Sequence, residues 1–269
     1  MRSALFLISL ALSSASCSQA DEFGEKIGVD ETAVAAVSAR IEASEAEPVS
    51  VKEEADRYQF EWSYPAAAAA LPGLAQKLDA MGARSLAQLK DEANRDYETA
   101  QGESWEPRPH SATTKWSVVA DLPDFLSLSS QIATYGGGAH GNYTKTSMVW
   151  DKQAARSMSG VEMFVSPVAL GRALGPTLCE ALDAQREARR GEPAEPASTE
   201  WPNNCPPVGD ATVLVGSSNG ETFDRIGIYF GPYVAGAYAE GDYELNFPVT
   251  GAVLDAVKPE YAGAFSIKR

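Results

Sequence analysis

Three consecutive strand-like segments in the middle of the chain constrain the fold more than any other feature. Residues 113–121 alternate apolar and polar side chains, and residues 125–135 and 142–151 follow with spaced apolar positions. Such alternation is typical of half-buried strands. Turn-forming residues at 122–124 and 135–138 separate the segments, with no helical pattern between them. We therefore expect the three segments to pair as an antiparallel meander.

Further helices and strands are predicted on both sides of this meander. Aromatic residues at every second position of 56–64 predict a strand that ends at Pro65. Spaced leucines predict helices at 66–81 and, with Ser85 as N-cap, at 85–100. In chain order there follow a helix from 167 to about 182 capped by Ser166, strands at 212–215, 225–230 and 242–247, and a terminal helix at 248–256. Helices mixed with antiparallel strands indicate the α+β class.

The first residues have the layout of a secretory signal peptide, predicted over residues 1–16. One arginine precedes an apolar run at 4–12, which is too short to span a membrane, and small residues then lead to Cys17. Cys17 stands where a bacterial lipoprotein is lipidated; cleavage after Ala20 is the alternative. We expect export to the periplasm and a lipid anchor in the outer membrane as the only membrane contact, because Ser18, Gln19 and Ala20 directly after Cys17 include no Asp that would favour retention in the inner membrane.

Residues 17–52 are rich in Ala, Glu and Ser, which predicts an acidic tether. A helix packed on the folded domain is the alternative. Beyond the tether, Cys179 and Cys205 are the cysteines left for pairing, and an oxidising compartment favours a disulfide between them. Two buried free thiols are the other possibility.

Composition excludes several classes of function. The chain has 22 Lys and Arg against 37 Asp and Glu, a net charge of −15, whereas nucleic-acid binding requires a cationic face. With two His and three Cys, neither a histidine-built metal site nor a four-cysteine zinc module is expected. We predict no metal and no cofactor.

A glycine-rich segment, 136–141, invites a phosphate-binding interpretation that its context does not support. No Gly-Lys-Ser/Thr follows it, and a strand rather than a helix comes next. The glycines are expected to allow a strand bend. His140 within the segment is a candidate general base, but no Gly-x-Ser-x-Gly motif is present and no partner is fixed by the sequence. A cell-wall hydrolase using His140 is therefore kept only as the alternative function.

Two segments carry a family resemblance. The first is 127–150, with the centre Tyr-Gly-Gly-Gly-Ala-His-Gly-Asn at 135–142; the second is 229–241, which reads Tyr-Phe-Gly-Pro-Tyr-Val-Ala-Gly-Ala-Tyr-Ala-Glu-Gly. Together they resemble the DUF4163 and DUF3298 domains of bacterial envelope proteins. These domains occur in a lysozyme-sensing anti-sigma factor and beside the catalytic domain of a peptidoglycan deacetylase.

The resemblance implies a curved antiparallel sheet with a long helix packed on it. It places a DUF4163-like half at 53–165 and a DUF3298-like half at 166–269, packed as one unit. The chain departs from its relatives because it shows neither a membrane-spanning helix nor the deacetylase domain with its paired histidines. We therefore expect a non-catalytic envelope module.

Exposed tyrosines near the two motifs are the candidate binding groups, since aromatic rings stack on sugars and anchor protein interfaces. The expected ligand is a lysozyme-like protein, which is commonly cationic, or peptidoglycan. A structural envelope protein without a specific ligand is a third possibility. The candidate ligand-binding residues are Tyr135, His140, Asn142, Tyr233 and Tyr238.

Overall fold

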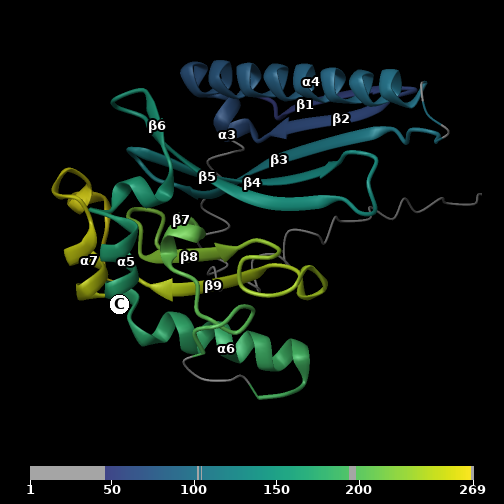
Figure 1. Ribbon diagram of the computed structural model, residues 1–269. Helices are drawn as coiled ribbons and strands as arrows, with labels where there is room; N and C mark the ends of the chain where they lie inside the picture. The colour runs from purple at the N-terminus through teal and green to yellow at the C-terminus, as the bar shows by residue number, and fades with distance from the viewer. Residues whose placement is uncertain (1–45, 102, 104, 194–197, 268–269) are drawn as a thin grey trace, which may run out of the picture.

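The computed structural model describes residues 46–101, 103, 105–193 and 198–267. The predicted signal peptide, the lipidation site Cys17 and most of the predicted tether lie outside the described residues. The fold consists of a six-stranded, mostly antiparallel sheet, a three-stranded antiparallel sheet, a long helix and several short helices (Figure 1). This arrangement confirms the α+β class. No helix within the described residues is long and apolar enough to cross a membrane.

The larger sheet has six strands in sequence order, β1 to β6. The strands are β1 (Val49–Ala55), β2 (Tyr58–Tyr64), β3 (His110–Asp121), β4 (Phe125–Tyr135), β5 (Asn142–Asp151) and β6 (Arg156–Met158). The predicted meander is confirmed, because β3, β4 and β5 pair antiparallel. Two features differ from expectation: β2 and β3 pair parallel, and β1 begins inside the segment assigned to the tether.

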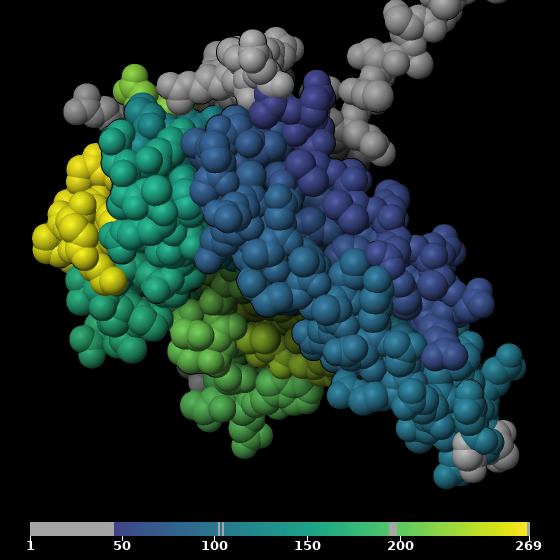
Figure 2. All heavy atoms as spheres, turned by 90° about the horizontal axis from the view of Figure 1, so that it is seen from above, coloured from purple at the N-terminus to yellow at the C-terminus, as the bar shows by residue number. Residues whose placement is uncertain are grey.

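A long helix connects the two parallel strands and covers one face of this sheet (Figures 1 and 2). After the short α3 (Ala66–Ala69), α4 runs unbroken over Pro72–Ala100, so the expected second helix capped by Ser85 is wrong. Gly82 does not end the helix. A Cβ on Gly82 would lie 3.0 Å from the indole ring of Trp62, so glycine allows α4 to approach the sheet closely. Leu74, Leu78 and Trp116 complete the core between helix and sheet.

The C-terminal part places three helices around a second sheet. Ser166 caps α5 (Pro167–Leu174) by accepting a 3.0 Å hydrogen bond from the Ala169 amide, as predicted. The single helix expected there is divided, because Gly175 has a φ of 59° and α6 (Pro176–Arg190) begins after it. In chain order there follow β7 (Thr212–Gly216), β8 (Arg225–Phe230), β9 (Tyr243–Pro248) and α7 (Gly251–Ala256).

The smaller sheet, ordered β7-β8-β9, packs below the larger sheet on the side opposite α4 (Figure 1). A second core lies around it and includes Phe164, Leu182, Ile226 and Phe247. A cleft of about 910 Å³ lies between the sheets and is lined by residues of β3, β4, β5, β7, β8 and β9 and of α6. Lys145 of β5 and Glu244 of β9 form an ion pair that links the two sheets.

Candidate ligand-binding site

The two sequence motifs meet at one end of the molecule. The segment 136–141 joins β4 to β5, and the segment 231–242 joins β8 to β9 and includes a short helical turn, η3 (Tyr238–Glu240). The Tyr238 hydroxyl donates a 2.7 Å hydrogen bond to the Gly141 carbonyl oxygen. The Tyr238 ring stacks on His140, with centroids 4.2 Å apart and planes 27° apart. Each motif thus supplies half of one surface.

Four rings form this surface, which we call the aromatic platform: His140, Tyr143, Tyr233 and Tyr238. Tyr238 occupies the middle, with the Tyr233 centroid 5.3 Å away and the Tyr143 centroid 6.4 Å away in an edge arrangement. Tyr233 is 52% exposed. Trp201, 56% exposed, donates its indole N–H to the Tyr233 carbonyl oxygen at 3.3 Å and adds a fifth ring nearby.

Tyr233 also has an unusual backbone. Its φ of 69° lies in the left-handed region, which a bulky residue seldom adopts. Such strain costs about 1–3 kcal/mol and tends to occur at functional sites. The Tyr233 ring is exposed, so packing of the side chain in the core does not explain the left-handed backbone conformation.

The sequence-predicted candidates divide into three positions. His140, Tyr233 and Tyr238 lie together in the platform. Asn142 begins β5 beside it, where its side-chain oxygen accepts a 3.0 Å hydrogen bond from the Tyr143 amide. Tyr135 lies apart from the other rings: its hydroxyl donates to the Gly138 carbonyl oxygen at 2.9 Å and accepts from Arg108 at 3.2 Å, which fixes the glycine-rich loop.

His140 has contacts that orient its ring. Its Nδ1 lies 2.8 Å from the Gly141 carbonyl oxygen, so this nitrogen carries the proton, and Tyr238 covers one face of the ring. Among the described residues, no carboxylate hydrogen bond of the kind that orients a catalytic histidine is found at His140. The geometry therefore supports a stacking role for His140 better than an acid–base role.

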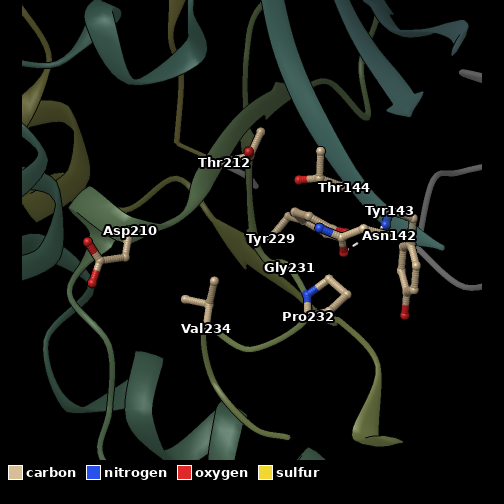
Figure 3. A pocket seen from close by; sticks show the side chains of 9 residues that line it. All are labelled: Asn142, Tyr143, Thr144, Asp210, Thr212, Tyr229, Gly231, Pro232 and Val234. Atoms are coloured by element: carbon tan, nitrogen blue, oxygen red, sulfur yellow. Dashed lines mark hydrogen bonds between the residues drawn. The ribbon is translucent and has the colours of Figure 1, made fainter. Parts of the chain in front are cut away.

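A small polar pocket of about 160 Å³ lies beside the platform (Figure 3). Tyr143 belongs to both, and Pro232 and Val234 flank Tyr233. Figure 3 shows side chains from the starts of β5 and β7 and from the loop after β8 around a common space. The lining residues are Asn142, Tyr143, Thr144, Asp210, Thr212, Tyr229, Gly231, Pro232 and Val234.

Tyr229 is the most unusual residue of the pocket. It is 2% exposed, and its buried hydroxyl lies near the Asp242 carboxylate. A Cβ built on Gly231 would lie 3.8 Å from this hydroxyl and 3.5 Å from Thr144 Oγ1, so the hydroxyl is on the pocket side. Burial, with a smaller contribution from the Asp242 carboxylate, raises the pKa of Tyr229, which keeps the phenol protonated at neutral pH.

Helix α6 holds the loop that carries Tyr233 and Tyr238. Arg186, 1% exposed, donates hydrogen bonds to the carbonyl oxygens of Ala235 at 2.6 Å and Asn204 at 2.8 Å. Arg190 Nε donates to Glu240 Oε2 at 2.8 Å. These contacts join the loop, the helix and the segment around Asn204 into one unit.

The predicted disulfide is confirmed and fastens the same unit. Cys179 on α6 is bonded to Cys205, with Cα atoms 5.5 Å apart. The bond holds the chain next to the Arg186 contacts at Asn204. Among the described residues, no cluster of His, Cys, Asp or Glu has the arrangement of a metal site.

Sequence reasoning missed part of the site. Tyr143 and Tyr229 stand within the two motif segments but were not selected as candidates, and Trp201, outside both segments, was not considered. The burial of Tyr229 could be anticipated from its place in a strand beside Phe230. The closeness of its hydroxyl to the Asp242 carboxylate could not, because that depends on how separate segments pack together.

The chain is similar to two solved structures and, over part of its length, to one family model. A solved structure of a DUF3298 family member from Bacteroides fragilis has 14% identity and a TM-score of 0.45, covering 82% of this chain and 97% of its own. One of a DUF3298 family protein from Pseudomonas aeruginosa has 15% identity and a TM-score of 0.48, covering 83% and 98%. No curated protein matches the chain. Residues 51–143 match the family model described as Deacetylase PdaC, so within this segment the chain resembles PdaC-type domains, as the sequence predicted.

Proposed function

We propose that this chain is a cell-envelope module that binds the glycan strand of peptidoglycan on the aromatic platform. The observation that carries the proposal is the meeting of both sequence motifs in one set of rings, centred on Tyr238 and open to solvent at Tyr233. Exposed tyrosine and tryptophan rings present flat apolar faces with polar edges, which suits the faces of sugar rings. The match to a deacetylase family model and the resemblance to envelope domains support the same class of ligand.

The test is cosedimentation of the mature chain with purified peptidoglycan sacculi, using Cys17→Ser to avoid the lipid. We expect binding, and we expect Tyr233→Ala to weaken it about tenfold, since one exposed ring of a binding surface contributes about 1–2 kcal/mol. Val168→Ala on α5 removes another exposed apolar side chain, away from the platform, and is the matched control. Absence of binding to sacculi, together with tight binding to a cationic muramidase, would favour the protein ligand instead.

The proposal includes export and anchoring through Cys17. The apolar run followed by small residues and this cysteine supports a lipoprotein of the outer membrane. Metabolic labelling with a palmitate analogue, followed by membrane fractionation, tests the assignment. We expect label in the outer-membrane fraction for the natural chain and none for Cys17→Ser. A labelled Cys17→Ser variant, or an unlabelled natural chain processed after Ala20, would contradict it.

A further inference from the structure

We propose that the cleft between the two sheets binds a short acidic peptide in an extended conformation. None of the rings of the aromatic platform lines this cleft, so the inference goes beyond the proposed function and does not depend on it. It is carried by the volume of the cleft, by a row of hydrogen-bond donors across the larger sheet and by a local reversal of the protein's charge.

The cleft exists because the two sheets turn polar faces toward each other. Trp116 and Leu128 of the larger sheet pack under α4, so alternate residues of the same strands, including Ser117 and Ser129, point toward the smaller sheet below (Figure 1). Sheets packed face to face usually fill the space between them with interdigitating side chains. Here a space of about 910 Å³ remains, near the upper end of the range of about 300–1,000 Å³ that is common for ligand sites.

A row of donors crosses the wall that the larger sheet contributes. Lys115 of β3 lies opposite Gln131 of β4, and Gln131 lies opposite Lys145 of β5. All three side chains line the cleft, so they form one cross-strand row on its wall. In the next row, Ser117 lies opposite Ser129, and both also line the cleft. Ammonium, carboxamide and hydroxyl groups all donate hydrogen bonds, so this wall suits a ligand rich in carboxylate oxygens.

The charge of the cleft is opposite to that of the whole protein. Four basic and two acidic side chains line it, in a chain whose net charge is −15. Lys145 is paired with Glu244 across the cleft, but an ammonium group has three donors and can serve a second acceptor. Lys115 forms no ion pair with any residue that the structure describes. The charged lining residues are Lys115, Lys145, Arg189, Arg225, Asp242 and Glu244.

The spacing of the two lysines suits two carboxylates of an extended peptide. Neighbouring strands lie about 4.8 Å apart, so Lys115 and Lys145 leave the sheet about 10 Å apart, and their flexible side chains can converge. In an extended peptide, side chains two residues apart point to the same side and are about 7 Å apart. Glutamates at the first and third positions of such a peptide can therefore each meet one lysine.

The cleft also offers acceptors, which favours a peptide over a ligand that only accepts hydrogen bonds. Asp242 and Glu244 line the wall formed by the smaller sheet. Peptide N–H groups and a charged amino terminus can donate to these carboxylates, whereas a polyphosphate would be repelled by them. Val119 and Leu214 also line the cleft and suit the methylene groups of long acidic side chains.

Calorimetric titration of the mature Cys17→Ser chain at neutral pH and low salt tests the class of ligand. The probes are triglutamate, triglutamine and inorganic triphosphate. The two peptides share a backbone and differ in side-chain charge, whereas triphosphate carries charge without a peptide backbone. We expect triglutamate to bind at least about tenfold more tightly than either other probe, because charged hydrogen bonds add to the backbone contacts. No binding of triglutamate, equal binding of the two peptides, or equally tight binding of triphosphate would overturn the proposal.

Two variants localise the peptide, and all positions changed are exposed, so the fold should be retained. Lys115→Gln removes one charge from the row and should weaken triglutamate binding about tenfold. Gln131→Glu places a carboxylate between the two lysines and should weaken binding at least as much. Lys77→Gln and Gln76→Glu make the same charge changes on α4, beyond the opposite face of the larger sheet, and should change the affinity less than about twofold.

The outcomes separate the cleft from the net charge and from the aromatic platform. Equal losses in the cleft variants and in their α4 controls would overturn the site, because only the total charge would then matter. Loss of triglutamate binding in Tyr233→Ala would also overturn it, since the peptide would then lie on the platform. Selective losses in Lys115→Gln and Gln131→Glu, with Tyr233→Ala unchanged, would support the inference whether or not the chain binds sacculi.

Discussion

Glu240 shows how one carboxylate can organise the loop of the aromatic platform. One oxygen accepts hydrogen bonds from Arg190 at 2.8 Å and from the Tyr243 hydroxyl at 2.5 Å, and the other accepts from the Ala237 amide at 3.0 Å. Burial opposes ionisation, but the hydrogen bonds from Arg190, Tyr243 and Ala237 outweigh it and lower the pKa of Glu240. The folded loop therefore favours the charged form.

This lowered pKa predicts a pH-dependent contribution to stability. A carboxylate whose pKa is lower in the folded state stabilises the fold above its unfolded value, about 4.5, and loses that contribution as the pH falls through the folded value. We expect Glu240→Gln to reduce the free energy of unfolding by about 1–2 kcal/mol at neutral pH, with the difference shrinking below about pH 4.5. Urea denaturation at several pH values measures it, with exposed Glu106→Gln as control. A difference that stays constant with pH would contradict this origin.

The composition of the site could be predicted only in part. Tyr233 and Tyr238 stand in a motif whose glycines and proline mark a loop, so their exposure follows from local sequence. The pocket does not follow, because Thr212 and Val234 belong to separate segments that only the pairing of β7 with β8 brings together. Polar residues are common at the ends of strands, so the sequence does not show which of them line a pocket.

At the scale of elements, α6 acts as the support of the aromatic loop. Arg186 makes five hydrogen bonds, all to groups of the loop, of the segment 203–204 or of its own helix. It donates to the carbonyl oxygens of Asn203, Asn204 and Ala235, of which Ala235 is buried. A buried, fully paired guanidinium is tolerated only in such surroundings.

Removal of this side chain should therefore be costly. We expect Arg186→Ala to lower the free energy of unfolding by about 3–5 kcal/mol, because it leaves these carbonyl oxygens without their donor and opens a cavity. Arg172→Ala, at an exposed position of α5, should cost less than about 0.5 kcal/mol. Urea unfolding followed by tryptophan fluorescence measures both. Similar small losses in the two variants would show that the Arg186 contacts contribute little.

The Cys179–Cys205 bond should stabilise the folded protein by lowering the conformational entropy of the unfolded chain. It closes a loop with a sequence separation of 26, for which chain entropy predicts about 3 kcal/mol. We expect reduction with dithiothreitol to lower the free energy of unfolding by that amount. The double variant Cys179→Ser, Cys205→Ser should be destabilised equally and should not respond to reductant. Equal stability of oxidised and reduced protein would contradict the prediction.

The elements also show where sequence patterns fail. The meander and β7 to β9 were predictable because one face of each strand is buried and the alternation is visible. β1 was not, because most of its side chains are exposed on this edge strand, which β2 holds through backbone pairing. The helix boundaries were misplaced because glycine has two different roles here. Gly82 allows close packing inside the continuous helix α4, whereas Gly175 ends α5. Sequence alone does not separate these two uses of glycine.

At the scale of the whole molecule, the net charge of −15 separates the two classes of ligand considered for the platform. A cationic protein would be attracted to this charge, and the attraction would weaken steeply as salt shortens the Debye length from about 14 Å near 50 mM to about 4 Å near 500 mM. A neutral sugar stacked on the rings of the platform depends little on that field. Binding constants measured across this range of salt therefore report which interaction dominates.

We expect the dissociation constant for chitotriose to change less than about twofold between about 50 and 500 mM NaCl, because its contacts involve no net charge. Any association with a cationic muramidase should weaken by at least about tenfold over the same range, since steering by opposite charge is screened. Calorimetry with the mature Cys17→Ser chain measures both, and Tyr233→Ala shows which binding uses the platform. Salt-insensitive muramidase binding that is lost in Tyr233→Ala would contradict the glycan assignment, because it would show a shape-specific protein interface on the same rings.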